Sequence, residues 1–251
     1  MSGAPRLILA SASPRRRELL GRLGVAFTVD PAEIPEELPA QAPRAERVAR
    51  RLARAKALAV AARYPGLPVL AADTVVVFRG RLLGKPADET EARAMLLELR
   101  GRWHRVITAV AVARHRRVRV DHAVTLVRMR AYSDEEIASS IARGDPFDKA
   151  GAYAIQDGCF RPVAEYLGCY CNVVGLPLAL VVKLLDRAGI AVSVSMKQLL
   201  PECAHCPLFA RWRNGDSSGG GLYARHSAGA RGLRPAAGGG TPARAPASAR
   251  G

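Results

Sequence analysis

The ten-residue run at positions 69–78, Val-Leu-Ala-Ala-Asp-Thr-Val-Val-Val-Phe, is the feature that most limits how this chain can fold. Its β-branched and apolar composition predicts a buried strand. Asp73 lies in the middle of this run. Because burying an unpaired carboxylate is costly, Asp73 must lie at a strand end, pair with a cation or bind a metal ion. A metal-binding or general-base role and a purely structural bulge are both compatible with the sequence here.

Helices and strands alternate around this run. Apolar periodicity predicts helices over residues 44–63, 88–99, 133–143 and 176–188, and strands over residues 25–29, 106–113 and 119–130. Ser133 with Glu136 three residues later is the capping box of the helix that begins there. This alternation is typical of an α/β protein built on one sheet.

A short apolar run from residue 7 ends at Ser13 and Pro14, which suit the N-cap and the first position of a helix reaching about residue 22. Three arginines at positions 15–17 crowd its first turn, although the partial positive charge of a helix N-terminus disfavours cations. A phosphate bound at this terminus would remove the conflict. Arginines that only face solvent are the alternative interpretation.

Charge and composition narrow the class of partner. The 251 residues carry a formal net charge of +16, which favours nucleotides, nucleic acid or an acidic surface. The sequence has no run of eighteen apolar residues and no secretory signal, so we expect a cytoplasmic protein with no membrane contact. Five cysteines in such a protein favour reduced thiols over disulfides.

The composition changes near residue 192. Residues 192–251 carry eight Lys or Arg against two acidic residues, and from residue 215 onward Gly, Ala, Ser, Pro and Arg dominate. We therefore place the functional domain at 1–191 and a basic, largely disordered tail at 192–251. Within this tail Cys203 and Cys206 have the spacing of half a zinc site, but the sequence shows no second well-spaced pair.

Two later turns present polar groups. Lys85 lies in a Gly-Lys-Pro turn, which is a weak signal by itself. Gln156 closes a turn-rich segment that begins at residue 144. Its amide offers donors and an acceptor, so Gln156 suits either a base edge or the end of a strand. His104 has no second histidine at ligand spacing, and we expect it to be structural or solvated.

Taken together and in order, these segments resemble the Maf family of nucleoside triphosphate pyrophosphatases. The similar motifs are Ser-Ala-Ser-Pro-Arg-Arg at 11–16, Ala-Asp-Thr at 72–74, Gly-Lys-Pro at 84–86, Asp-Lys-Ala-Gly-Ala-Tyr at 148–153, Ile-Gln at 155–156 and Asn-Val-Val-Gly-Leu-Pro at 172–177. The resemblance covers roughly residues 6–188, and several collinear motifs are more specific than any one of them. It implies an α/β domain with a mixed central sheet flanked by helices and two lobes with a cleft, similar to inosine triphosphate pyrophosphatases.

The resemblance also implies a reaction, the hydrolysis of the α–β phosphoanhydride of a nucleotide to the monophosphate and pyrophosphate. A divalent cation, Mg²⁺ or Mn²⁺, is the implied cofactor. Asp73 matches the family's catalytic acid, which would bind the cation or take a proton from the attacking water. Glu36 matches a glutamate that we assign to binding of the same metal or to positioning of the water.

Arg15, Thr74 and Gln156 match the positions that sort the family by base. Their identities are those of the branch that hydrolyses dTTP and UTP, so we expect these and modified pyrimidine triphosphates as substrates. The phosphate-binding residues implied by the resemblance are Ser13, Arg16, Lys56 and Lys85.

Two residues depart from the family pattern, because Ala154 and Asp157 stand where glycines are usual. We expect a stiffer loop and a negative charge near the base pocket. The rival functions are a 7-methyl-GTP or purine-directed pyrophosphatase and a cell-division regulatory protein that binds nucleic acid through its basic tail. The core itself has too few aromatic residues, 5% of the chain, to favour nucleic acid. A homodimer is compatible with the sequence.

Overall fold

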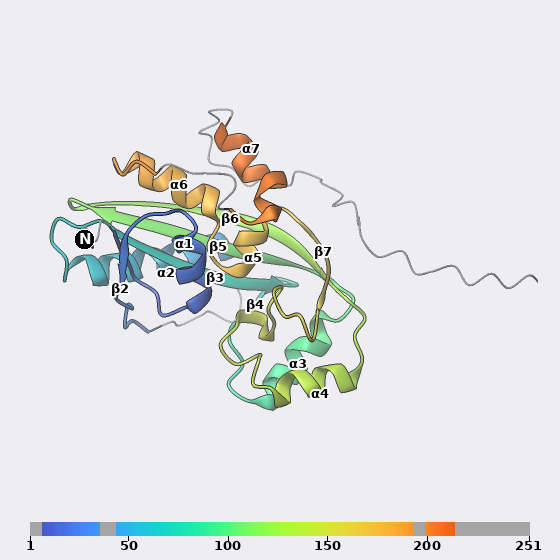
Figure 1. Ribbon diagram of the computed structural model, residues 1–251. Helices are drawn as coiled ribbons and strands as arrows, with labels where there is room; N and C mark the ends of the chain where they lie inside the picture. Colours follow the sequence, from blue (N-terminus) through green and yellow to red (C-terminus); the bar gives the residue numbers. More distant parts are fainter. Residues whose placement is uncertain (1–6, 36–43, 193–198, 214–251) are drawn as a thin grey trace, which may run out of the picture.

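The computed structural model describes residues 7–35, 44–192 and 199–213, which form one mixed sheet flanked by helices (Figure 1). The strands are β1 (Leu7–Leu9), β2 (Phe27–Val29), β3 (Val69–Phe78), β4 (Arg81–Leu83), β5 (Trp103–Arg114), β6 (Arg117–Met129) and β7 (Val163–Leu167). The α-helices are α1 (Pro14–Gly21), α2 (Ala45–Ala61), α3 (Glu89–Leu99), α4 (Asp134–Ala142), α5 (Tyr170–Val174), α6 (Leu178–Arg187) and α7 (Pro207–Arg213). Two short 3-10 helices, η1 (Ala150–Ala152) and η2 (Pro201–His205), complete the set.

The strand order is β2-β1-β3-β5-β6-β7, with β4 paired to β3. β1 runs parallel to both β2 and β3, and the remaining pairs are antiparallel. Along the same edge of β3, β1 pairs only with Val69 and Leu70, whereas β4 pairs with residues 76–78. The middle of β3, where Asp73 lies, therefore has no strand partner on this edge among the described residues, and the edge is left open for a cleft.

The period of two along β3 divides the core into two faces. Val69, Ala71, Val75 and Val77 pack in the cluster that contains α2, whose alanines at positions 45, 49, 53 and 57 form one inward stripe. On the opposite face Leu70 and Ala72 pack with α1, α5 and α6, whereas Val76 and Phe78 pack with α3 and α4. Small alanines let α2 lie close to the sheet, and its exposed face is rich in arginine.

A second lobe covers the far end of the sheet. Residues of α3, α4 and η1 pack there against the ends of β3, β5 and β6 in a separate apolar cluster. Figure 1 shows α3 and α4 side by side below the sheet, away from α1 and α6. The prediction of a mixed sheet flanked by helices in two lobes is therefore confirmed.

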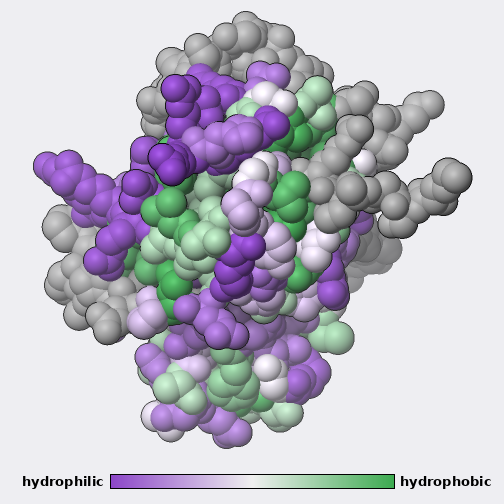
Figure 2. Space-filling view, turned by 90° about the vertical axis from the view of Figure 1, so that its left-hand side faces the viewer, coloured by the Kyte–Doolittle hydropathy of each residue, from purple (hydrophilic) through white to green (hydrophobic). Residues whose placement is uncertain are grey.

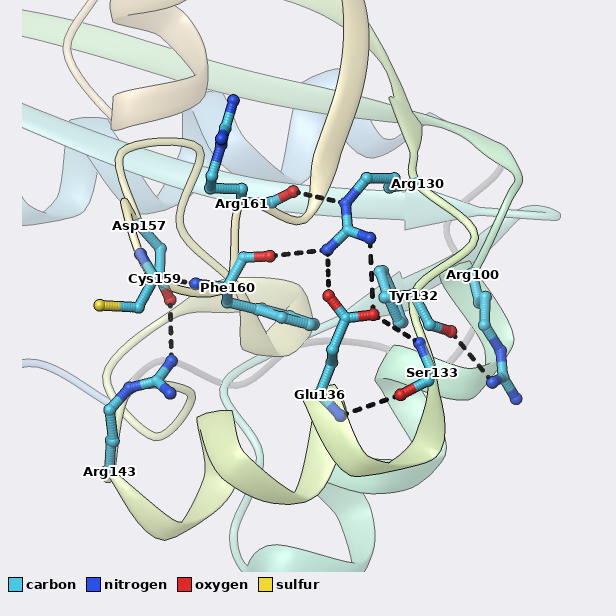
Figure 3. Close-up of polar contacts among 10 residues, drawn as sticks. All are labelled: Arg100, Arg130, Tyr132, Ser133, Glu136, Arg143, Asp157, Cys159, Phe160 and Arg161. Atoms are coloured by element: carbon cyan, nitrogen blue, oxygen red, sulfur yellow. Dashed lines mark hydrogen bonds and ion pairs between the residues drawn. The ribbon is translucent and has the colours of Figure 1, made fainter. Parts of the chain in front are cut away.

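Most predicted elements are present with shifted ends. The strand over residues 69–78 and the capping box of Ser133 and Glu136 are confirmed, and Figure 3 shows the box with Arg130 bound to Glu136. β5 and β6 are longer than predicted because they meet in a tight turn at His115 and Arg116, both with positive φ. The short elements β4, β7 and α5 were not predicted, because their three to five residues mix polar and apolar side chains without a clear period.

The packed part of the chain continues past residue 191, where we expected a tail. Leu199, Cys203, Cys206 and Phe209 are buried in the same cluster as α6 and the sheet. Residues 199–210 are themselves rich in apolar side chains, but the Gly-, Ala-, Pro- and Arg-rich stretch that follows dominates the composition of residues 192–251, so composition did not reveal their packing. The Gly- and Arg-rich residues 214–251 lie outside the described residues. Within the part of the chain that the structure describes, no helix is both long and apolar enough to cross a membrane.

Figure 2 views the molecule from the side that lies at the left of Figure 1. Strongly hydrophilic residues cover much of this side, and apolar residues show between them. Side chains with ionic heads can cover apolar surface with their stems, so such a mixed surface is expected of a protein with 24% charged residues.

His104 on β5 is a structural residue, which was one of the two roles expected for it. Its side chain is buried (3% exposed), and its Nε2 lies 2.7 Å from the hydroxyl of Tyr153, which follows η1. Burial lowers the pKa of His104 to about 4. The imidazole is therefore neutral in the folded protein at neutral pH, where it joins β5 to the second lobe.

This low pKa predicts an acid-sensitive fold. The unfolded chain protonates His104 near pH 6.5 and the folded chain near pH 4, so the unfolded state binds more protons between these values. The free energy of unfolding should fall by up to roughly 3 kcal/mol as the pH drops from 6.5 to 4. Urea titrations across this range test the prediction. His104→Gln should flatten the dependence, whereas His115→Gln at the exposed turn should keep it; equal slopes in wild type and His104→Gln would contradict it.

Candidate active site

A cleft of about 340 Å³ opens between the two lobes, a size typical of small-molecule sites. Every candidate residue within the described ranges lines it. The first lobe contributes Ser13, Arg15, Arg16 and Lys56. β3 contributes Asp73 and Thr74, and the second lobe contributes Lys85 and Gln156. Glu36, which we assigned to a metal ion from the sequence, lies outside the described residues.

The floor of the cleft holds a buried ion pair. Lys56 of α2 donates from Nζ to Oδ1 of Asp73 at 2.5 Å, and the two residues are only 7% and 5% exposed. Asp73 shares the face of β3 that packs on α2, so its carboxylate points at the helix that carries Lys56. Asp73 is thus neither a bulge nor a strand end but a paired charge in mid-strand. Removing one partner of such a buried pair typically costs about 3–5 kcal/mol.

The start of α1 forms one wall of the cleft. Ser13 is the N-cap, and its Oγ accepts a hydrogen bond from the backbone N–H of Arg16 at 3.4 Å. Arg15 reaches across to the second lobe, where its Nη1 lies 3.0 Å from Oδ2 of Asp148. Arg17 is exposed and is not among the residues that line the cleft. The three consecutive arginines therefore have different environments.

Asp148 at the cleft mouth lies between two cations. Lys149 approaches its Oδ1 at 2.5 Å, and Arg15 approaches its Oδ2. Burial raises the pKa of Asp148, but the hydrogen bond from Lys149 and the charge of Arg15 outweigh this effect, so its pKa is lowered. The carboxylate is charged at neutral pH, and an incoming anion must compete with it for Arg15. The motif at 148–153 contains Asp148 and Lys149, but the sequence could not place Arg15 beside them.

Arg16 is bound by the protein itself. Its Nε donates to the carbonyl oxygen of Gly175 at 2.9 Å, its Nη1 to Oγ of Ser11 at 3.2 Å and its Nη2 to Oγ1 of Thr74 at 3.1 Å. These bonds hold the guanidinium plane between β3 and the loop after α5. In this position Arg16 brings positive charge to the cleft and fixes the hydroxyl of Thr74.

Each threonine hydroxyl has one proton to donate, and this fixes the direction of the hydrogen bond between Thr74 and Thr108. Thr108 Oγ1 donates its single proton to the carbonyl oxygen of Asn172 at 2.8 Å, so it can only accept from Thr74 Oγ1 at 2.9 Å. Thr74 therefore donates to Thr108 and accepts from Arg16. Only acceptor capacity is left on this hydroxyl for a ligand.

Asn172 anchors this network and was not identified as a site residue from the sequence. It is fully buried, its Oδ1 accepts from the backbone N–H of Thr108 at 3.0 Å, and its Nδ2 donates to the carbonyl oxygen of Val106 at 3.0 Å and to Oγ1 of Thr125 at 2.8 Å. The available signal was its place at the head of the Asn-Val-Val-Gly-Leu-Pro motif. Asn172 holds β5, β6 and α5 in register beneath the cleft.

The expected negative charge of Asp157 near the base pocket is wrong. Asp157 is not among the cleft residues; its Oδ1 accepts from the backbone N–H groups of Cys159 at 2.9 Å and Phe160 at 2.8 Å. Its Oδ2 lies 3.6 Å from Arg143, so the side chain points toward α4, as Figure 3 shows. A short carboxylate that caps its own turn is a favourable local arrangement, and this turn directs Asp157 away from the ligand.

The ligand atoms available around Asp73 suit a cation whose other ligands come largely from the nucleotide substrate. Among the described residues, no three His, Cys, Asp or Glu side chains are grouped as a ready metal site. Mg²⁺ commonly uses one or two carboxylates together with substrate phosphates and water. One buried carboxylate at the floor of a cationic cleft is compatible with that mode of binding.

Replacement of the network anchor should destabilise the fold. Asn172→Ala leaves the N–H of Thr108 and the carbonyl of Val106 without their side-chain partner in a dry interior. We expect the free energy of unfolding to fall by roughly 2–4 kcal/mol, since each orphaned buried group costs about 1–3 kcal/mol. Urea unfolding measures this, with Ser139→Ala on the exposed side of α4 as the control. A change no larger than that of the control would show that the network is not important for stability.

Comparisons with known proteins agree with this geometry. Residues 6–188 match the family described as Maf-like protein. A dTTP/UTP pyrophosphatase of Thermomicrobium roseum is 64% identical over 203 residues, which cover 80% of this chain and 93% of that protein. Proteins of the same name from Gloeobacter violaceus and Myxococcus xanthus are 49% and 52% identical, over 72% and 73% of this chain and 94% and 93% of theirs.

A solved structure, the nucleoside-triphosphatase and dITP/XTP pyrophosphatase of Mycobacterium abscessus, matches at 15% identity with a TM-score of 0.37, over 83% of this chain and 95% of that one. The assignment to a family does not depend on this match. It follows from the family match over most of the chain and from relatives that are aligned almost end to end. The chain therefore belongs to the Maf family.

Proposed function

We propose that this protein is a nucleoside triphosphate pyrophosphatase, which hydrolyses the α–β phosphoanhydride of dTTP, UTP and modified pyrimidine triphosphates to the monophosphate and pyrophosphate. The observation that carries the proposal is the buried pair of Asp73 and Lys56 at the floor of a cleft with cationic walls. The names of the relatives, dTTP/UTP pyrophosphatase, support the choice of nucleotide.

The triphosphate would bind between the lobes. Arg15 lines the cleft from the first lobe and Lys85 lines it from the second. Charge-assisted hydrogen bonds of this kind are shorter and stronger than neutral ones. Arg16 would contribute mainly through its charge, since three protein acceptors hold its guanidinium. A phosphate that replaces Asp148 as the ion-pair partner of Arg15 would then draw the two lobes together around the ligand.

Asp73 would accept the proton of the attacking water. As the water oxygen bonds to phosphorus, the bridging oxygen leaves with pyrophosphate and the proton passes to Asp73. Lys56 fixes the carboxylate for this transfer and adds positive charge beside the phosphates. Asp73, together with Glu36, would also hold the Mg²⁺ or Mn²⁺, and the cation would neutralise charge on the leaving pyrophosphate.

Gln156 would read the base. It is exposed at the cleft rim in the loop after η1, where its amide can donate to one atom and accept from its neighbour. The imide edge of thymine or uracil offers the matching carbonyl and N–H. Cytosine lacks the N–H, and a purine needs more room than a pyrimidine, so both should be poorer substrates.

A nucleotide panel tests the proposal. With Mg²⁺ or Mn²⁺ we expect pyrophosphate release to be fastest from dTTP and UTP. Asp73→Asn should lower kcat by about 10²–10⁴ because it removes the proton acceptor, while circular dichroism shows the fold retained. Asp186→Asn on the exposed face of α6 is the matched control. No pyrophosphate from any triphosphate would refute the activity, and a preference for 7-methyl-GTP or a purine would refute the substrate assignment.

Substitution of Asp157 tests whether its carboxylate stabilises the turn or acts on the substrate. Because its carboxylate caps the backbone and faces Arg143, Asp157→Ala should lower the free energy of unfolding by about 1–2 kcal/mol. The ratio of kcat/KM for dTTP over UTP should stay the same. Thermal unfolding and steady-state kinetics measure the two quantities. A changed ratio with unchanged stability would show that Asp157 acts on the substrate.

A further inference from the structure

Four of the five cysteines meet at one place in the fold. Cys169 and Cys171 lie at the start of α5, whereas Cys203 and Cys206 lie in and after η2. All four are only 1–3% exposed and belong to the same buried cluster. The fifth, Cys159, is exposed in the loop beside Asp157 (Figure 3). The fold thus brings a second pair, Cys169 and Cys171, into the same cluster as Cys203 and Cys206.

The two cysteine pairs meet across this junction. The Sγ atoms of Cys171 and Cys203, one from each pair, are 3.4 Å apart. Cys169 and Cys206 lie within three residues of these two and are buried in the same cluster. The fold therefore gathers four thiols from two separate segments of the chain.

We propose that Cys169, Cys171, Cys203 and Cys206 bind one zinc ion as a structural tetrathiolate site. The two spacings, Cys-x-Cys and Cys-x-x-Cys, provide four soft ligands, which is a common ligand set for structural zinc. On binding, each thiol releases its proton to solvent as its sulfur bonds to the ion. The other chemistry open to the cluster is oxidation, in which Cys171 and Cys203 form a disulfide.

Small side-chain movements complete the site. Zn–S bonds of about 2.3 Å place tetrahedral sulfurs about 3.8 Å apart, close to the 3.4 Å between Cys171 and Cys203. As the side chains stand, no three of them in the described residues form a ready cage, so the thiols must turn toward a common centre. Rotation about the Cα–Cβ bonds provides movement of this size.

The proposed ion would fasten the C-terminal segment to the floor of the cleft. Cys169 donates from its backbone N–H to Oγ1 of Thr125 and accepts from the same hydroxyl at its carbonyl, and Thr125 also bonds Asn172. α5 further carries Val173 and Val174, which line the cleft. The zinc site would therefore hold η2 and α7 against the element that supports Thr74.

Metal analysis of the full-length, tag-free protein tests the proposal and does not depend on its activity. After dialysis against a weak chelator we expect one zinc per chain by elemental mass spectrometry. The Cys203→Ser/Cys206→Ser double variant should lose it, and Cys159→Ser should keep it. Zinc absent from the wild type, iron in its place or zinc retained by the double variant would overturn the proposal.

A second measurement uses only the wild-type chain, in case the double variant does not fold. X-ray absorption at the zinc edge should show four sulfur neighbours at about 2.3 Å. A thiol reagent should release the zinc as these four cysteines react. Nitrogen or oxygen neighbours would overturn the site, as would an intact mass under non-reducing conditions that is lighter by two hydrogens and marks a disulfide.

Discussion

The ion pair between Asp73 and Lys56 is the contact on which the architecture around the cleft depends. Two opposite charges buried between α2 and β3 are stable only when they are held close together, and the sheet and helix must pack tightly to do this. The alanine stripe of α2 allows that approach, and the gap between β1 and β4 exposes the pair to a ligand. Packing and the proposed catalytic chemistry thus rely on the same short distance.

The polar groups behind this pair form one connected network. Arg16, Thr74, Thr108, Asn172 and Thr125 use each donor and acceptor in a fixed direction, so the hydroxyl beside the ligand has a defined role. A buried network of this kind is favourable only when its members are all satisfied. It links the cleft floor to α5 and, through Cys169, to the cysteine cluster and the C-terminal segment.

Much of the fold and most of the candidate site were predictable from local pattern. Long segments such as β3 and α2 were predicted from their periodicity. The collinear motifs contain seven residues that the structure places in one cleft, and the family resemblance added an eighth, Lys56. The short elements β4, β7 and α5 were not predictable, because elements of this length are stabilised by the strands and helices around them rather than by their own sequence. Asp157 was misplaced because a turn of three residues decided where its carboxylate points.

The sequence by itself determined the alternation of helices and strands, the family and the residue types that line the cleft, because these depend on local periodicity and on motif order. Only the tertiary structure decided which groups pair. Lys56 meets Asp73, Arg15 meets Asp148 and Cys171 meets Cys203 across 17, 133 and 32 positions of the chain. Such contacts depend on how the strands and helices pack in three dimensions, and no spacing along the chain encodes them.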